Sequence, residues 1–474
     1  MAQEKGRKAH FIGIGGVGMS AVAKLLQDSG WEVSGSDEAV YPPISTQLSS
    51  YGIAWSTPYQ PSNIPEDVDL IVIGKNAKLV AESNEEVAAA YASGKPIKSF
   101  PDVLGDLSQE KETVVVAGSY GKSTSVALLA HCLEVAGGDP SYFIGAVPIT
   151  PTTSARIGAG RLFVMEGDEY PASNTDSRSK FLLMQPAHTL VTPLAHDHFN
   201  IFPTTEDYLK PFYELTELLS ENATLVVATS GTLSRVYLST IKHPHVTYGI
   251  AEGDYHADNI AWGEHTSFDI VHQGEKIVRV QTSQLGEHNV ENIVGVAAFL
   301  FTRNLVTPEQ FVTAVAGFKG VVRRMDRKSD QTRVPIFEGF GSSYEKAKSA
   351  IAAMRLHFPT RPLRIVFEPN TIGWRARASL VQYDDAFEGA AMAYVYNPPH
   401  DGKQTELSTE EIVERVVQGG TPAVAVHTPE EALDAIEKDL SSGDCILLLS
   451  SGPMGGLIES IPHLAEERFP ASGK

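Results

Sequence analysis

Two segments of the chain share one order of parts: an apolar strand, a glycine turn and a helix. The first is HFIGIGGVGMSA, residues 10–21, and the second is VVVAGSYGKSTSVALL, residues 114–129. A glycine turn at the start of a helix presents backbone N–H groups at the positive end of the helix dipole, where anions bind. Both segments therefore predict α/β units that can hold a phosphate group at the carboxyl end of a strand.

Apolar strands alternate with amphipathic helices along almost the whole chain, which predicts parallel sheets covered by helices. With 474 residues the chain is too long for a single hydrophobic core. We expect an α/β protein of three domains: a Rossmann-like domain over residues 1–108 with the first glycine turn as its ligand site, a central P-loop ATPase-like domain over 109–325, and a Rossmann-like domain over 326–474. Alternation between about residues 254 and 285 predicts antiparallel hairpins.

The first glycine turn leaves its ligand open. Gly13, Gly15 and Gly18 fit the pattern G-x-G-x-x-G, and Asp37 ends the next strand, where an acidic residue would meet a ribose hydroxyl. The turn would serve equally for a dinucleotide in hydride transfer, for a phosphate of another ligand, or as a tight turn without a ligand. The rest of the chain has to decide among these.

The second glycine turn, GSYGKS, is a short form of the phosphate-binding loop. Backbone N–H groups from Gly118 to Lys122 would surround phosphates, the Lys122 ammonium would neutralise their charge, and the Ser123 hydroxyl would bind Mg²⁺. This predicts an ATP site. A chain with its own ATP site is a poor dehydrogenase, so we expect the first turn to hold a diphosphate that belongs to the substrate.

Acidic and histidine side chains follow two later strands. FVMEGDEY ends one strand with Glu166, Asp168 and Glu169, and PLAHDHFNIF ends another with His196 and His198. In a parallel sheet both strand ends open onto the same edge as the phosphate-binding loop. We therefore expect Glu166 and His198 to bind metal ions beside the γ-phosphate.

Composition excludes several classes of partner. The chain has 38 Lys and Arg against 58 Asp and Glu, a net charge of −20, which argues against a general nucleic-acid or anionic-membrane surface. No apolar run has membrane-spanning length, and we expect a cytoplasmic protein. Cys132 and Cys445 lie far apart in apolar segments, which predicts buried thiols.

The order of the motifs G-K-[ST], E-x-D-E, D-H, GEHN and RR resembles the Mur ligase family. The segments YPPIST and DSRSKF are most similar to its muropeptide-ligase (Mpl) branch. That resemblance implies ATP- and Mg²⁺-dependent formation of an amide, through an acyl phosphate, between UDP-N-acetylmuramate and L-alanyl-γ-D-glutamyl-meso-diaminopimelate in peptidoglycan recycling. Two alternatives stay open: a ligase whose acceptor is L-alanine or another amine, and a nucleotide-binding homologue without turnover.

The resemblance also implies roles for individual residues. It gives catalytic roles to Lys122, Glu166 and His198, and metal binding to Ser123, Glu166 and His198. The residues implied to bind ATP are Gly118, Ser119, Tyr120, Gly121, Lys122, Ser123, Thr124, Asn289 and Arg324. The residues implied to bind the UDP-linked substrate are Gly15, Gly16, Val17, Gly18, Ser36, Asp37 and Arg178.

One segment departs from the family pattern. Where the family has D-D-[FY]-x-H-x-P, this chain has EGFGSSY, with Gly339 in place of an aspartate and residues 342–344 in place of His-His-Pro. We expect nucleotide orientation, domain closure or acceptor choice to change. Tyr213 occupies the position where some members have a carbamylated lysine; the branch that adds alanine lacks that lysine too, so this difference counts little against activity.

Overall fold

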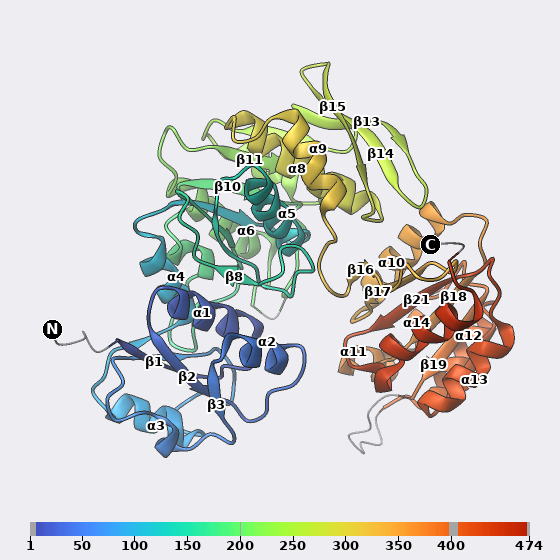
Figure 1. The fold of residues 1–474 in the computed structure, drawn as a ribbon, viewed down its shortest axis with the longest axis horizontal. Coiled ribbons are helices and arrows are strands. Elements are labelled where there is room, and N and C mark those ends of the chain that lie inside the picture. The colour runs from blue at the N-terminus through green and yellow to red at the C-terminus, as the bar shows by residue number, and fades with distance from the viewer. Residues whose placement is uncertain (1–5, 200, 398–405, 472–474) are drawn as a thin grey trace. The chain divides into compact units, whose positions relative to one another are not determined.

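The computed structural model describes residues 6–199, 201–397 and 406–471, and it confirms an α/β fold. Three sheets dominated by parallel strands follow one another along the chain, one for each expected domain (Figure 1). The chain packs as two compact units, the first formed by residues 1–259, 268–281 and 288–318, and the second by 260–267, 282–287 and 319–474. The exact boundaries at 108 and 325 stay predictions.

The first sheet has five parallel strands in the order β3-β2-β1-β4-β5. The chain runs from β1 outward through β2 and β3 on one side, and then returns to place β4 and β5 on the other side of β1. The carboxyl ends of β1 and β4 therefore form the switch point where ligands bind in such sheets. Val22 and Leu25 of α1 are fully buried against this sheet's core. The elements are β1 (Lys8–Ile12), α1 (Val17–Asp28), β2 (Glu32–Ser36), α2 (Ile44–Tyr51), β3 (Ala54–Ser56), η1 (Pro61–Asn63), β4 (Leu70–Ile73), α3 (Glu85–Ala92), β5 (Ile97–Lys98) and α4 (Phe100–Ser108).

The second sheet has the order β15-β14-β13-β12-β11-β10-β6-β9-β7-β8, and β6 pairs in parallel with both β9 and β10. Helix α8 is buried along most of its length because nearly all of its sides are apolar. The elements are β6 (Glu112–Ala117), α5 (Lys122–Val135), β7 (Ser141–Phe143), β8 (Ala155–Arg156), β9 (Leu162–Glu166), η2 (Lys180–Leu183), β10 (His188–Val191), α6 (Thr205–Glu217), β11 (Leu225–Ala228), α7 (Ser234–Thr240), β12 (Val246–Gly249), β13 (Tyr255–Ala261), β14 (Thr266–His272), β15 (Glu275–Thr282), α8 (Glu287–Thr302) and α9 (Pro308–Gly317).

The alternating segment after residue 254 forms three neighbouring strands, β13, β14 and β15. Only Gln273 and Gly274 join β14 to β15, and their φ angles are 52° and 81°. Two consecutive positive φ angles are typical of the tight turn that closes a two-residue hairpin. The predicted hairpin is therefore confirmed at this turn.

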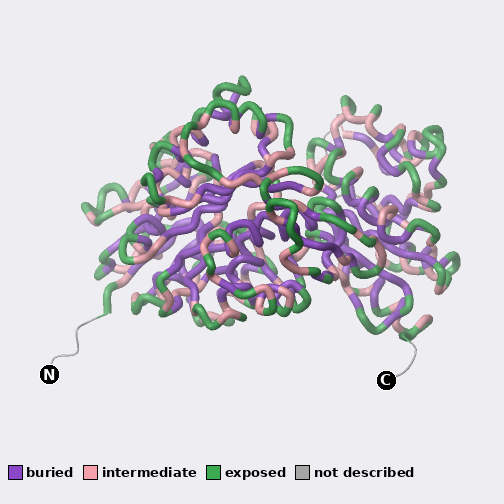
Figure 2. Tube along the Cα trace, turned by 90° about the horizontal axis from the view of Figure 1, so that it is seen from above, coloured by how far each residue is buried: buried purple, intermediate pink, exposed green. Residues whose placement is uncertain are grey.

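The third sheet has the order β16-β17-β21-β18-β19-β20, in which β16 is antiparallel to β17 and the other pairs are parallel. The strands of the sheets are largely buried, whereas loops are exposed (Figure 2). The elements are β16 (Arg324–Arg327), β17 (Ile336–Phe340), α10 (Tyr344–His357), β18 (Leu363–Phe367), α11 (Ile372–Arg375), η3 (Arg377–Asp384), β19 (Met392–Tyr396), α12 (Thr409–Gln418), β20 (Ala423–Val426), α13 (Pro429–Asp439), β21 (Cys445–Ser450), η4 (Met454–Gly456) and α14 (Leu457–Arg468).

Cys132 and Cys445 are free and buried, which confirms the sequence prediction. Burial raises the pKa of both thiols, that of Cys445 to about 12, so neither is a reactive thiolate near neutral pH. Among the helices in the described part of the chain, none is long and apolar enough to span a membrane.

The segment EGFGSSY packs against its own unit. Gly339 is buried in β17, where a Cβ atom would lie 3.1 Å from Leu449 Cδ2, 3.3 Å from Ala350 Cβ and 3.4 Å from Met325 Sδ. Ser343 caps α10 by accepting a hydrogen bond from the backbone N–H of Lys346. The residues that depart from the family pattern are therefore parts of a local packing arrangement.

We predict that Gly339→Asp lowers the midpoint of thermal unfolding by at least about 4 °C, because it buries a carboxylate among apolar side chains at a cost of about 2 kcal/mol or more. Ser343→Asp is the matched control, since aspartate also caps helices well and the site is only half-buried. Thermal unfolding followed by circular dichroism measures both variants. Equal midpoints for the two would contradict the packing described for Gly339.

We also predict that Gly121→Ala is much more damaging than Gly137→Ala. Both glycines flank α5 and have positive φ, 83° and 78°, so an alanine is strained at either position by about 1 kcal/mol. A Cβ atom at Gly121 would overlap the Asn292 carboxamide, whereas nothing lies within 4 Å of one at Gly137. Thermal unfolding and ATP titration should both show the difference, and similar losses in the two variants would refute the close approach to Asn292.

Candidate active site

The phosphate-binding loop leads from β6 into α5, as predicted. Gly118 has a φ of 136°, and a Cβ atom there would overlap the Thr192 hydroxyl at the end of β10. Ser119 fastens the loop to the same strand end, since its hydroxyl donates to Ala195 O at 2.7 Å and accepts from Ala195 N at 2.8 Å. Helix α5 begins at Lys122 without a side-chain cap. Its first N–H groups thus have the arrangement that suits a phosphate.

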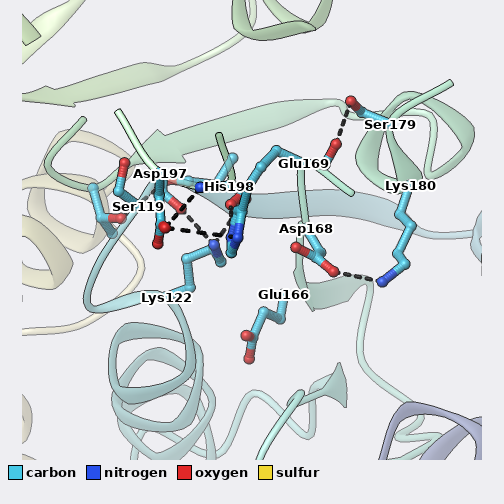
Figure 3. A network of polar contacts seen from close by, with 12 residues as sticks. Ser119, Lys122, Glu166, Asp168, Glu169, Ser179, Lys180, Asp197 and His198 are labelled. Atoms are coloured by element: carbon cyan, nitrogen blue, oxygen red, sulfur yellow. Dashed lines mark hydrogen bonds and ion pairs between the residues drawn. The ribbon is translucent and has the colours of Figure 1, made fainter. Parts of the chain in front are cut away.

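Lys122 folds back over this loop and meets a buried carboxylate. Its Nζ donates to Gly118 O at 2.5 Å and to Glu169 Oε2 at 2.9 Å (Figure 3). Glu169 is only 1% exposed, and its other oxygen lies 3.1 Å from His198 Nε2. Glu169 therefore joins the lysine of the loop to the histidine that follows β10.

The carboxylates of this cluster raise the pKa of the two basic groups beside them, Lys122 and His198. Burial alone would lower the pKa of Lys122, but the carboxylates of Glu169 and Asp168 carry it above its ordinary value. The Glu169 carboxylate likewise raises the pKa of His198. The loop lysine is thus kept cationic, which is the form that neutralises phosphate charge.

Ser123 and Glu166 form a second contact beside the loop. The Ser123 hydroxyl donates to Glu166 Oε1 at 2.9 Å, and Glu166 Oε2 accepts from Gly145 N at 2.8 Å. A hydroxyl and a carboxylate at this position are the oxygen ligands that suit Mg²⁺, so these residues fit the expected ion. The structure joins His198 to Glu169 rather than to Glu166, and no group of three or more His, Cys, Asp or Glu residues suited to a metal occurs in the described ranges. The metal-binding roles stay predictions.

The remaining residues expected to bind ATP lie in three helices or loops of the first unit and in one strand of the second. Asn289 is buried in α8, where its Oδ1 accepts from Asn292 Nδ2 at 3.2 Å. Thr124 is buried in the first turn of α5, and Tyr120 is 53% exposed in the loop. Arg324 belongs to the second unit and is exposed at the start of β16. The contacts of these residues with a nucleotide stay predictions.

The first glycine turn places Asp37 beside its backbone. Gly15 N donates to Asp37 Oδ2 at 2.8 Å, and the Tyr59 hydroxyl donates to Asp37 Oδ1 at 3.0 Å. Gly16 precedes Val17 and Gly18, and α1 starts there without a side-chain cap. This end of α1 therefore has the same anion-binding arrangement as the start of α5.

Two residues expected to bind the UDP-linked substrate have their side chains engaged within the protein. Ser36 is buried, and its hydroxyl donates to Glu86 Oε1 at 2.5 Å. Arg178 is exposed and holds Asp176, with Nη2 2.7 Å from Asp176 Oδ2. Their predicted roles are not tested by these contacts.

The sequence reasoning gave no role to Glu169, Asn292 or Tyr59. Glu169 was visible in the run EGDE, but nothing in that run distinguishes which carboxylate turns toward Lys122. Asn292 belongs to none of the predicted motifs, and only its packing on Gly121 identifies it. Tyr59 follows no motif and is found through its bond to Asp37.

Two family models match the chain. The model of the Mur ligase family catalytic domain matches residues 8–112, and that of the Mur ligase middle domain matches residues 116–300. The first covers the five-stranded sheet with its glycine turn. The second covers the phosphate-binding loop, Glu166, Glu169 and His198.

Relatives match over nearly the whole chain. The UDP-N-acetylmuramate–L-alanine ligase of Hydrogenobaculum sp. (strain Y04AAS1) is 28% identical over 96% of this chain and 98% of its own length. The enzyme of the same name from Sorangium cellulosum (strain So ce56) is 29% identical over 98% and 97%. Among relatives with curated names, similarity to L-alanine ligases thus extends from end to end.

Solved structures share the fold. The UDP-N-acetylmuramate–alanine ligase MurC of Thermotoga maritima has a TM-score of 0.78 at 22% identity and covers 97% of this chain and 99% of its own. A murein peptide ligase of Psychrobacter arcticus has a TM-score of 0.66 at 22% identity over 98% and 100%. The peptide ligase MPL of a Neisseria species is 30% identical, with a TM-score of 0.61, over 67% of this chain and 100% of its own. The chain therefore belongs to the Mur ligase family and is an ATP-dependent carboxylate–amine ligase.

Proposed function

We propose that the protein joins the muramoyl carboxylate of UDP-N-acetylmuramate to the amine of an amino acid or peptide in the cytoplasm, with ATP and Mg²⁺. The observation that carries this proposal is the pair of uncapped helix starts in one unit, at α1 and α5, of which the second holds Lys122 against buried Glu169. One glycine turn suits the diphosphate of the substrate and the other suits ATP.

L-Alanine is the acceptor that we favour. The segments YPPIST and DSRSKF favour a peptide acceptor, but the curated relatives from Hydrogenobaculum sp. and Sorangium cellulosum, which match over nearly the whole chain, are L-alanine ligases. The tripeptide L-alanyl-γ-D-glutamyl-meso-diaminopimelate is the second candidate. It is supported by the 30% identity to the Neisseria peptide ligase.

A carboxylate is a poor electrophile because its charge is spread over two oxygens. Transfer of the γ-phosphoryl group of ATP to it breaks the bond to ADP and gives an acyl phosphate, from which the amine displaces phosphate. Lys122 would neutralise charge on the transferred group, and Glu169 keeps its ammonium charged and in place. Mg²⁺, when bound by Ser123 and Glu166, would supply further neutralisation of phosphate charge.

The acceptor is tested by ADP release from the purified protein supplied with ATP, Mg²⁺ and UDP-N-acetylmuramate. We expect release that depends on L-alanine, with a lower kcat/KM for the tripeptide. Efficient release with the tripeptide and little with L-alanine would reverse the order of the two candidates. No release with either acceptor would contradict the proposed function.

Replacement of the loop lysine tests the phosphate chemistry. We predict that Lys122→Ala lowers kcat by at least about 100-fold, because a cation is removed from the transferring phosphoryl group. Glu169→Gln should lower kcat less, since the ammonium remains but loses its anionic partner. Lys210→Ala is the control, as Lys210 is 73% exposed on α6. Near-normal turnover of a folded Lys122→Ala protein would refute the assigned role.

A further inference from the structure

Two lysines of the first unit approach the same aromatic ring. Lys75 follows β4, and its Nζ lies 5.3 Å from the centroid of the Tyr170 ring. Lys180 begins η2, and its Nζ lies 5.7 Å from that centroid. Both ammonium groups thus face the loop that follows Glu169, although one comes from the loop after β4 and the other from η2.

Lys180 connects the first glycine turn to the phosphate-binding loop. Its Nζ lies 5.3 Å from the centroid of Phe100, and that ring lies 3.4 Å from the Cβ position of Gly18 in the first turn of α1. Toward the central sheet, Lys180 Nζ lies 2.5 Å from Asp168 Oδ2, and Figure 3 shows Asp168 between Lys180 and Lys122. Burial acts to raise the pKa of Asp168, but the ammonium groups of Lys180 and Lys122 hold it below its usual range.

Lys75 adds a second positive charge beside this pair. Burial and the neighbouring Lys180 lower its pKa, and within residues 6–199, 201–397 and 406–471 it has no ion-pair partner. It lines an open cavity of about 370 Å³ together with Pro171 and residues 173–177. Asn174, which also lines that cavity, ties it to the loop that carries Lys75, since its Nδ2 donates to Asn76 O at 2.9 Å and to Leu79 O at 3.0 Å.

Lys180 therefore pairs with Asp168, whereas Lys75 adds an ammonium group that no carboxylate pairs with in the described part of the chain. A cation that is partly removed from water and has no such partner favours an anionic ligand. The N–H groups of the first glycine turn suffice for a diphosphate. Lys180 lies between the first glycine turn and Lys122. The carboxylate that receives the γ-phosphoryl group has to face Lys122 as well.

Building on the proposed function, we propose that Lys75 and Lys180 bind the muramoyl carboxylate of the substrate and so select it over a UDP-sugar that lacks this group. The polar cavity beside Lys75 would take the attached sugar. The lysines are binding and specificity-determining residues. They orient the carboxylate toward the γ-phosphate and take no part in the bond changes.

Calorimetric titration with UDP-N-acetylmuramate and with UDP-N-acetylglucosamine separates the carboxylate from the diphosphate, because both ligands carry the diphosphate and only the first carries the carboxylate. We expect Lys75→Met and Lys180→Met each to raise the Kd for UDP-N-acetylmuramate by about tenfold or more, as for a lost charge-assisted hydrogen bond. The Kd for UDP-N-acetylglucosamine should change less than about twofold. Lys78→Met, three residues along the same loop but 68% exposed, is the matched control and should change neither.

Lys180→Arg keeps the cation and should retain most of the selectivity, which separates loss of charge from local misfolding. Circular dichroism and ATP titration check the fold of each variant.

Equal losses of affinity for both UDP-sugars would assign the lysines to the diphosphate and overturn the inference, as would unchanged affinity for both. If the unaltered protein binds neither UDP-sugar, the proposed function itself fails. Selective binding by the unaltered protein that survives both methionine substitutions refutes only the role of the lysines.

Discussion

The parallel pairing of β6 with β9 and β10 brings three strand ends to one edge of the central sheet, and the contacts of the candidate site depend on it. Gly118 follows β6, Glu166 ends β9, and Thr192 follows β10. Because the backbone of Gly118 lies against Thr192, the phosphate-binding loop is fixed to the strand that leads to His198. The site is thus held by backbone pairing between strands, which is insensitive to the nature of most surface side chains.

At this edge of the central sheet, individual carboxylates hold the lysine side chains in position. Each of Lys122 and Lys180 has its own carboxylate, Glu169 and Asp168, in a protein that is otherwise strongly acidic. A buried lysine without such a partner would deprotonate, or its side chain would turn out to solvent. If an anionic substrate binds at this edge as we propose, the carboxylates already hold the lysines in position for it.

The strand, turn and helix segments were predictable because each is encoded locally: apolar strand, glycine, then amphipathic helix. The hairpins after residue 254 were predicted from alternation, which is also a local pattern, and the turn at Gln273 and Gly274 confirms one of them. The partners of the charged side chains were not, since Lys122 and Glu169 are 47 residues apart and EGDE offers three carboxylates in four positions. Lys75 follows β4 and Lys180 begins η2, and both approach Tyr170 only through the fold, so no spacing in the sequence relates them.

The first glycine turn shows why a phosphate-binding motif does not identify its ligand. Asp37 ends its strand where an acidic residue would meet a ribose, yet one of its oxygens accepts from Gly15 N and the other from the Tyr59 hydroxyl. Backbone N–H groups at the start of α1 attract an anion of any origin. In our proposal the neighbourhood of the turn distinguishes a ligase substrate from a dinucleotide. Phe100, the first residue of α4, lies beside Gly18 and beside the Lys180 ammonium. Lys180 in turn pairs with Asp168, whose charge acts on Lys122 of the phosphate-binding loop.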